Sequence, residues 1–236
     1  MLTVEGIDVY IQASHILRQV SLEVGRDEVV CLVGRNGAGK TTTLRTIMGY
    51  LRPRAGSIRF GGQPIHGRRT HEIAMLGVGF TPEESGIFAD LSVGENIEIA
   101  TWTRPTARPA AERIEEAYAV FPKLRGYRAR GGGQLSGGER KMLSIARALA
   151  LDPALLLLDE PFEGLAPAII PAVADSIAAI AGKLGRAILM AESNVHHVPD
   201  YAARLYVIER GEIVFAGPPS DARRDPALAR IIGGSA

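Results

Sequence analysis

The sequence predicts an α/β fold on a mostly parallel sheet, with an antiparallel β subdomain at the N-terminus and an inserted helical lobe. Short apolar, β-rich runs recur along the chain, at Val29–Val33, Gly77–Thr81, Leu155–Leu158 and Ala187–Ala191. Such runs are typical of strands that are covered on both faces, as in parallel sheets. Segments of helical length separate them, and this alternation indicates an α/β fold.

The two ends of the chain favour antiparallel strands. Apolar and polar residues alternate from Leu2 to Ile11 and again from Val20 to Val24, as in half-buried strands. Near the C-terminus, Leu205–Glu209 and Glu212–Phe215 read as strands, and the Arg210-Gly211 pair between them is typical of a hairpin turn.

Between about residues 82 and 150 the pattern is helical. Helices are expected at Val93–Ala100, Ala110–Phe121 and Gly137–Ala150, with no convincing strand. We therefore predict a single domain over residues 1–236. Its α/β core with the β subdomain covers about residues 1–81 and 151–236, and its helical lobe covers about residues 82–150.

Composition excludes several classes of protein. With 46% hydrophobic residues the chain can form a full core, so a disordered chain is excluded. Charge is balanced, 27 Lys+Arg against 26 Asp+Glu, which gives no reason to expect nucleic acid as a partner. The single cysteine, Cys31, excludes an internal disulfide. We expect no signal peptide and no membrane span, so any membrane role requires docking onto other proteins.

A phosphate-binding loop follows the buried strand Val29–Val33. The segment GRNGAGKTT, residues 34–42, matches the pattern G-x-x-x-x-G-K-[ST] and precedes a helical pattern. Its glycines let backbone N–H groups turn toward a polyphosphate; Lys40 then reaches the β- and γ-phosphates, and the Thr41 hydroxyl binds Mg²⁺. The predicted nucleotide-binding residues here are Gly34, Asn36, Gly37, Ala38, Gly39, Lys40, Thr41 and Thr42.

Two carboxylates close the buried run LLLLDE, residues 155–160. An aspartate at such a strand end binds Mg²⁺ directly or through water, which suits Asp159. A neighbouring glutamate orients or deprotonates the attacking water, which suits Glu160. On its own this pattern is more often an ordinary strand end; together with Lys40 it predicts a nucleoside-triphosphate site.

A third motif, LSGGE at residues 135–139, stands directly before a helical pattern. Its Ser136, Gly137 and Gly138 are placed at a helix N-terminus, which is an anion-binding position. The alternative is a plain N-cap formed by Ser136 beside a flexible glycine pair. The first two motifs alone are compatible with kinases, GTPases and helicases. The third motif is therefore needed to decide between these classes of protein.

The three motifs in this order resemble the ATP-binding subunits of ABC transporters over nearly the whole chain. The resemblance implies a head-to-tail dimer in which Ser136, Gly137 and Gly138 of one subunit contact ATP that is held by Lys40 of the other. The partner subunit is an identical chain or a paralogous ATPase. The resemblance also implies that Tyr10 stacks on adenine, whereas a half-buried strand residue is the alternative.

Three short segments of the sequence resemble one subgroup of this family in particular. TPEESGIFADLSVGEN (81–96), EGLAP (163–167) and AESN (191–194) are similar to the smaller ATPase subunit of branched-chain amino acid importers. The resemblance implies two membrane permeases, an indirect solute-binding protein outside the cell and a peripheral location on the cytoplasmic face of the inner membrane. A urea or amide importer, a lipid or lipopolysaccharide exporter, a soluble non-transport ATPase and a non-hydrolysing nucleotide-binding module remain alternatives.

Two residues depart from the ABC pattern. Glu83 stands where the family usually has a glutamine that meets Mg²⁺ and the attacking water, and Ser193 stands at the position of the switch histidine. We expect both to act in catalysis, with Glu83 also a metal ligand, and we expect slow hydrolysis unless a more complete ATPase shares the dimer. His196 and His197 are expected on a following helix as surface residues.

Overall fold

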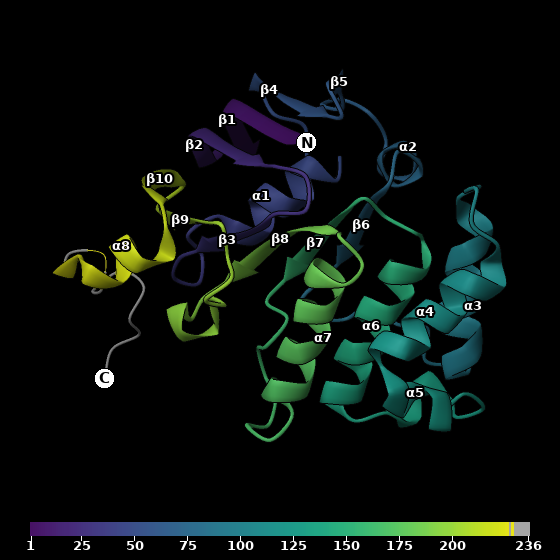
Figure 1. Ribbon diagram of the computed structural model, residues 1–236. Helices are drawn as coiled ribbons and strands as arrows, with labels where there is room; N and C mark the ends of the chain where they lie inside the picture. The colour runs from purple at the N-terminus through teal and green to yellow at the C-terminus, as the bar shows by residue number, and fades with distance from the viewer. Residues whose placement is uncertain (227, 229–236) are drawn as a thin grey trace. The chain divides into compact units, whose positions relative to one another are not determined.

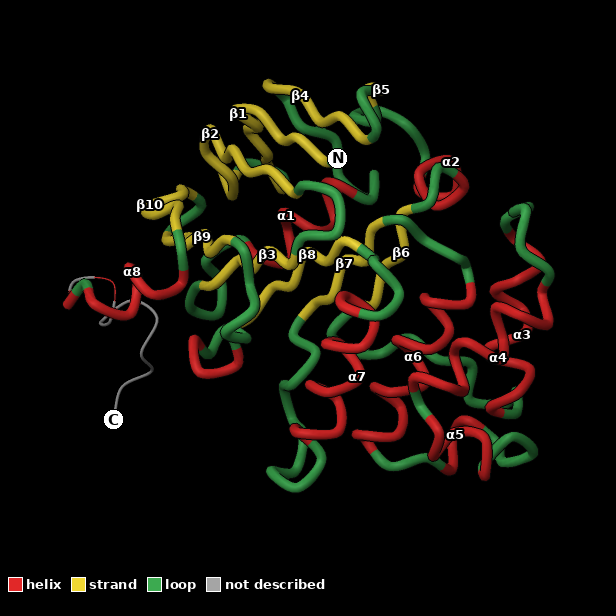
Figure 2. Tube along the Cα trace, viewed as in Figure 1, coloured by secondary structure: helices red, strands yellow, loops and turns green. Residues whose placement is uncertain are grey.

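The computed structural model describes residues 1–226 and residue 228 (Figure 1). These residues form two compact units. The first unit comprises Met1–Ile73 and the segment that starts at Ala187, and the second comprises Ala74–Arg186. Figure 2 shows the contrast between them, since strands dominate the first unit and helices the second.

An antiparallel sheet opens the first unit. Its strands are β1 (Leu2–Ile11), β2 (Ser14–Val24), β4 (Ala55–Phe60) and β5 (Gln63–Pro64), in the order β2-β1-β4-β5. Strand β1 therefore lies between β2 and β4. Its alternate side chains Leu2 and Val4 are almost fully buried, so the predicted N-terminal antiparallel strands are confirmed.

Parallel strands form the other layer of the first unit. Strand β3 (Val29–Val33) pairs in parallel with both β8 (Ala187–Glu192) and β9 (Arg204–Glu209). All residues of β3 are buried, Cys31 included. Strand β10 (Glu212–Gly217) pairs antiparallel with β9.

The turn between β9 and β10 is the predicted hairpin turn. Arg210 and Gly211 both have positive φ, 50° and 85°, as a type I′ turn requires. A Cβ atom on Gly211 would lie 2.0 Å from the carbonyl oxygen of Ile16, so only glycine fits there. The unit also contains the short helices α1 (Lys40–Ile47), η2 (Val195–His197) and α8 (Pro219–Arg224). Helix α2 (Thr70–Met75) includes Ile73, the last residue of this unit before the second unit begins.

The second unit contains the parallel pair β6 (Val78–Thr81) and β7 (Leu155–Asp159). Its helices are α3 (Val93–Thr103), α4 (Ala110–Val120), α5 (Pro122–Gly126), η1 (Gly132–Gln134), α6 (Gly137–Ala150) and α7 (Ile170–Gly182). Helix α6 packs against both α3 and α4, and it buries Leu143, Ile145 and Leu149 completely.

The predicted fold class is confirmed by the parallel pairs, the N-terminal antiparallel sheet and the helices after β6. Strands β4 and β5 were not predicted, because glycines at 56, 61 and 62 interrupt the pattern and only Ile58 and Phe60 of β4 are buried. The compact units divide the chain at other positions than residues 82 and 150, so the limits of the lobe stay a prediction. Residues 227 and 229–236 of the predicted core lie outside the described residues.

The Arg113 side chain caps the C-terminal ends of α3 and α6. Arg113 is 4% exposed, and its guanidinium donates to the carbonyl oxygens of Thr101 (3.0 Å) and Ala150 (3.2 Å). These carbonyls have no partner within their own helices. Beside them, Asp152 accepts hydrogen bonds from Arg108 at 2.9 Å and Arg186 at 2.6 Å.

Within the described residues, no helix is long and apolar enough to cross a membrane.

Replacing Arg113 by methionine tests this arrangement. The variant keeps most of the buried volume but leaves two helix-end carbonyls unsatisfied, so we expect a loss of about 2 to 4 kcal/mol in the free energy of unfolding. Urea denaturation followed by circular dichroism measures it. Arg140→Met, at an exposed position of α6, is the matched control, and we expect a change within about 0.5 kcal/mol. Equal losses in the two variants would contradict the role of Arg113.

Candidate nucleotide-binding site

The loop between β3 and α1 is shaped by close backbone contacts. A Cβ atom on Gly34 would lie 2.3 Å from the carbonyl oxygen of Ile208, and one on Gly39 would lie 2.7 Å from Leu17 Cδ2. Gly37 and Gly39 also have positive φ, 81° and 116°, which glycine adopts without strain. These positions therefore require glycine for structural reasons in addition to any bound phosphate.

Lys40, the first residue of α1, is 5% exposed. Its Nζ donates to the carbonyl oxygens of Gly34 at 2.8 Å and Arg35 at 3.3 Å, and to Ser193 Oγ at 2.9 Å. Ser193 Oγ in turn donates to Asn36 Oδ1 at 2.6 Å. The structure thus brings together three of the predicted site residues, Asn36, Lys40 and Ser193, around one ammonium group.

The first turn of α1 can receive an anion. Gly39 is the N-cap, no acidic residue lies in the first turn, and Thr41 and Thr42 are half-buried there. Ala38 is fixed by its backbone, because its N–H donates to Arg35 and its carbonyl accepts from Gly211 N–H at 2.9 Å. The positive end of the helix and the nearby Lys40 ammonium favour a polyphosphate at this end.

Tyr10 lies near the end of β1, opposite His15 of β2. The two rings stack with centroids 4.2 Å apart and an angle of 7° between planes. The Arg54 guanidinium carbon lies 4.1 Å from the Tyr10 centroid. Sequence reasoning missed both contacts of the predicted adenine-binding ring.

The predicted acidic residues lie in the second unit. Asp159 ends β7 and is 1% exposed, and Glu160 is 4% exposed with a positive φ of 47°. The buried ammonium of Lys141, from α6, donates to the carbonyl oxygens of Glu83 (2.7 Å) and Glu160 (3.0 Å). One lysine therefore holds the backbones of both predicted catalytic glutamates, and no sequence motif marked it.

Glu163 adds a further carboxyl group to this cluster. Burial raises the pKa of Glu163, and the negative charges of Glu83 and Glu160 raise that pKa further. Among the described residues, no group of histidine, cysteine, aspartate and glutamate is arranged to hold a metal ion by itself. Carboxylate and hydroxyl oxygens nevertheless suit Mg²⁺, which is usually bound by one or two carboxylates together with substrate phosphates.

Ser136 is the N-cap of α6. Its Oγ accepts from Glu139 N–H at 3.4 Å, and the Glu139 carboxylate accepts from Ser136 N–H at 2.9 Å. Lys123 lies 3.0 Å from the same carboxylate. Ser136 therefore caps α6, and its predicted contact with a nucleotide stays a prediction. Ser136 and Gly137 are exposed, whereas Gly138 is half-buried beside Ile169.

The prediction for the two histidines was partly wrong. Val195–His197 forms a helix as expected, although it is a single turn of 3₁₀ helix. His196 is exposed as predicted, but His197 is only 20% exposed and its Nδ1 lies 3.1 Å from Oε2 of the buried Glu192. Because β8 ends in a carboxylate that needs a polar partner, His197 is drawn inward.

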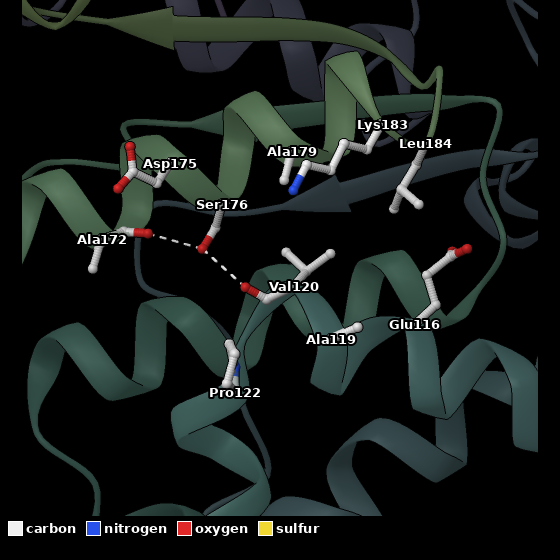
Figure 3. Close-up of a pocket in the computed structure, with 10 residues that line it drawn as sticks. All are labelled: Glu116, Ala119, Val120, Pro122, Ala172, Asp175, Ser176, Ala179, Lys183 and Leu184. Carbon is white, nitrogen blue, oxygen red and sulfur yellow. Dashed lines mark hydrogen bonds between the residues drawn. The ribbon is translucent and has the colours of Figure 1, made fainter.

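A cavity of 460 Å³ lies between α4 and α7 in the second unit (Figure 3). Small side chains such as Ala119, Ala172 and Ala179 line it, and Ser176 donates to the carbonyl oxygens of Ala172 (2.8 Å) and Val120 (3.2 Å). None of the predicted site residues lines this cavity. It therefore plays no part in the candidate site.

The capping box at Ser136 predicts an acid sensitivity. The hydrogen bond from Ser136 N–H and the contact with Lys123 lower the pKa of Glu139 from 4.5 to about 2. A lowered carboxyl pKa stabilises the fold fully above about pH 4.5, and this stabilisation is lost as the pH falls toward 2. We therefore expect Glu139→Gln to lose about 1 to 2 kcal/mol at pH 7 and less near pH 3.

Urea denaturation at several pH values measures this difference. Glu112→Gln, at an exposed position of α4, removes the same charge and is the control. A deficit of Glu139→Gln that stays constant from pH 7 to pH 3 would show that the carboxylate charge is not what stabilises the cap.

Comparisons with known proteins place the chain in a family. Residues 17–163 match the family model described as ABC transporter. The chain is 34% identical over 233 residues to the lipopolysaccharide export system ATP-binding protein of Haemophilus influenzae, covering 98% of this chain and 96% of that protein. It is 35% identical over 214 residues to the high-affinity branched-chain amino acid transport ATP-binding protein of Pseudomonas aeruginosa, covering 91% of each.

A relative in Archaeoglobus fulgidus, a probable branched-chain amino acid transport ATP-binding protein, is 33% identical over 207 residues, 88% of this chain and 87% of that protein. Among solved structures, the ADP conformation of an ATP-binding cassette of an ABC transporter matches with a TM-score of 0.86 and 26% identity, covering 100% of this chain and 99% of that one. With the loop around Lys40 and the capped LSGGE helix, these matches show that the chain belongs to the ABC transporter family, as an ATP-binding motor subunit whose ATP hydrolysis is coupled to transport.

Proposed function

We propose that this chain powers the import of branched-chain or other hydrophobic amino acids. The observation that carries the proposal is the segment TPEESGIFADLSVGEN, residues 81–96, which resembles the corresponding segment of such importers. The EGLAP and AESN strings point the same way, as do the relatives named for branched-chain amino acid transport. The solute itself is bound elsewhere in this type of system, by the permeases and a solute-binding protein.

Lipopolysaccharide export is the second candidate. Relatives named for that function match the chain over 98% of its length at a similar identity. The two candidates share the ATP site and differ in their permeases, so the permeases decide between them. In both cases the subunit would act at the cytoplasmic face of the inner membrane.

The proposed ATP site assigns one role to each group. Lys40 neutralises the β- and γ-phosphates, and backbone N–H groups of residues 34–42 bind the phosphate oxygens. Thr41, Asp159 and Glu83 would hold Mg²⁺, which supplies charge neutralisation on the phosphates when it is bound. Glu160 accepts the proton of the attacking water, and Ser193 contacts the γ-phosphate as a neutral donor.

The proposed catalytic unit is a dimer, with an identical chain or with a paralogous ATPase. Ser136, Gly137 and Gly138 of one chain would contact the ATP bound by the other. Both chains then donate to the same phosphates, so the dimer closes on ATP and loosens when the γ-phosphate leaves. This closure would be passed to two permeases.

Two substitutions separate binding from chemistry. Glu160→Gln removes the proposed proton acceptor but keeps the size of the side chain, so we expect ATP binding to persist and hydrolysis to fall by at least about 100-fold. Lys40→Ala removes the ammonium that faces the phosphates, and we expect ATP affinity to fall. Calorimetry measures the ATP affinity of both variants, and phosphate release measures the rate of hydrolysis. Substantial phosphate release by Glu160→Gln would exclude Glu160 as the base, and unchanged ATP affinity in Lys40→Ala would exclude the loop assignment.

The transport assignment is tested by the partners of the chain. We expect a tagged chain, purified from detergent-solubilised native membranes, to bring down two multispanning permeases of the amino acid importer type, as identified by mass spectrometry. The Lys40→Ala variant keeps the same surface and is the control for nucleotide-dependent capture. Recovery of lipopolysaccharide-export permeases would establish the second candidate instead, and recovery of soluble partners alone would exclude transport.

A further inference from the structure

Both faces of the Tyr10 ring are covered within the first unit. His15 stacks on the ring with centroids 4.2 Å apart, and the Arg54 guanidinium carbon lies 4.1 Å from the same centroid. Two groups at this distance cannot share one face of a single ring without overlapping. They also come from opposite sides of β1, because His15 belongs to β2 and Arg54 directly precedes β4.

A hydrogen bond to Asp8 holds the His15 side chain over the Tyr10 ring. Its Nε2 lies 2.9 Å from Asp8 Oδ1, and the Asp8 carboxylate also accepts hydrogen bonds from the backbone N–H (3.2 Å) and the side-chain amide of Gln19. The His15 side chain is 28% exposed and that of Asp8 is 16% exposed. Moving His15 off the ring therefore breaks a hydrogen bond inside a partly buried network.

The Arg54 side chain is held over the Tyr10 ring more weakly than the His15 side chain. Its backbone N–H donates to Asp8 O at 2.7 Å, which fixes where the side chain starts. The side chain itself is exposed, and no oxygen of the described residues accepts a hydrogen bond from its guanidinium. An exposed guanidinium gains little from lying over a tyrosine ring, so the Arg54 side chain can leave the ring at low cost.

The stack lies within reach of a nucleotide on the loop around Lys40. His15 precedes Leu17 by two residues on β2, and Leu17 Cδ2 packs against Gly39 at the start of α1. Two residues of a strand span about 6 to 7 Å, which is shorter than the distance from the base to the terminal phosphate of a nucleotide. A base attached to phosphates on this loop can therefore reach the ring.

We propose that Arg54 is a displaceable cover of the base-binding face of Tyr10, and that His15, fixed by Asp8, is the permanent support of the opposite face. Binding of the base replaces the guanidinium and leaves a stack of base, Tyr10 and His15. This inference rests on the proposed role of Tyr10 in base stacking. It makes Arg54 a competitor of the base, so loss of Arg54 strengthens the contribution of the base to binding.

The test compares two ligands that differ only in the adenosine. Calorimetry gives the Kd of inorganic pyrophosphate and of ADP, each with Mg²⁺, for the full-length chain and its variants. The ratio of the two constants isolates the contribution of the nucleoside and removes the general effect of a lost positive charge. Neither ligand is a substrate for ATP hydrolysis.

We expect Arg54→Ala to raise the ratio of the pyrophosphate Kd to the ADP Kd about two- to five-fold. The matched control Arg52→Ala removes the same charge from an exposed position two residues away and leaves the ratio unchanged. His15→Ala lowers the ratio about three-fold, because Tyr10 loses the stacking partner that fixes it. Thermal melts verify that the variants fold.

An unchanged or lowered ratio in Arg54→Ala overturns the proposal, and a raised ratio in His15→Ala assigns the base to the other face and overturns it as well. Failure of the proposed function gives a different result. If the wild type binds pyrophosphate and ADP equally, Tyr10 is not a base-stacking residue, and if it binds neither ligand, the loop is not a phosphate site.

Discussion

A buried ammonium group that donates to backbone carbonyls organises the candidate chemistry in each compact unit. Lys40 is 5% exposed and Lys141 is 3% exposed. Removing such a charge from water costs several kcal/mol unless hydrogen bonds and opposite charges compensate. Lys40 is compensated by Gly34, Arg35 and Ser193, and Lys141 by the carbonyls of Glu83 and Glu160. The loops that carry these carbonyls are consequently held in one conformation.

Local patterns predicted most of the fold and supply the residues of the proposed site. The loop around Lys40, the strand end at Asp159 and the N-cap at Ser136 depend on residues that are neighbours in the chain, so their spacing is informative. The strands β3, β7 and β8 were found because continuous apolar runs mark strands that are covered on both faces. The roles of these residues in one ATP site remain a proposal.

What escaped prediction depends on contacts between distant segments. Lys141 meets the carbonyls of residues 58 positions before it and 19 after it, and neither contact leaves a periodic signal. Arg54 and His15 meet on Tyr10 only because β1 lies between β2 and β4. His197 was read as a surface residue, since its partner Glu192 looks like an ordinary strand end in the sequence.

The capping box at Ser136 is compatible with the proposed contact to a partner's ATP. In the cap, Ser136 Oγ acts as an acceptor for Glu139 N–H. A serine hydroxyl is also a donor, and its O–H can rotate while the oxygen continues to accept. The cap therefore fixes the oxygen, whereas the O–H, which also hydrogen-bonds to the Glu139 carboxylate, would have to turn from that carboxylate to a phosphate. The Glu139 carboxylate accepts a hydrogen bond from Ser136 N–H and contacts Lys123. Its negative charge is therefore held beside these two donors. Structural capping uses the acceptor capacity of this hydroxyl group, and the proposed phosphate recognition would use its donor capacity, so one serine could serve both.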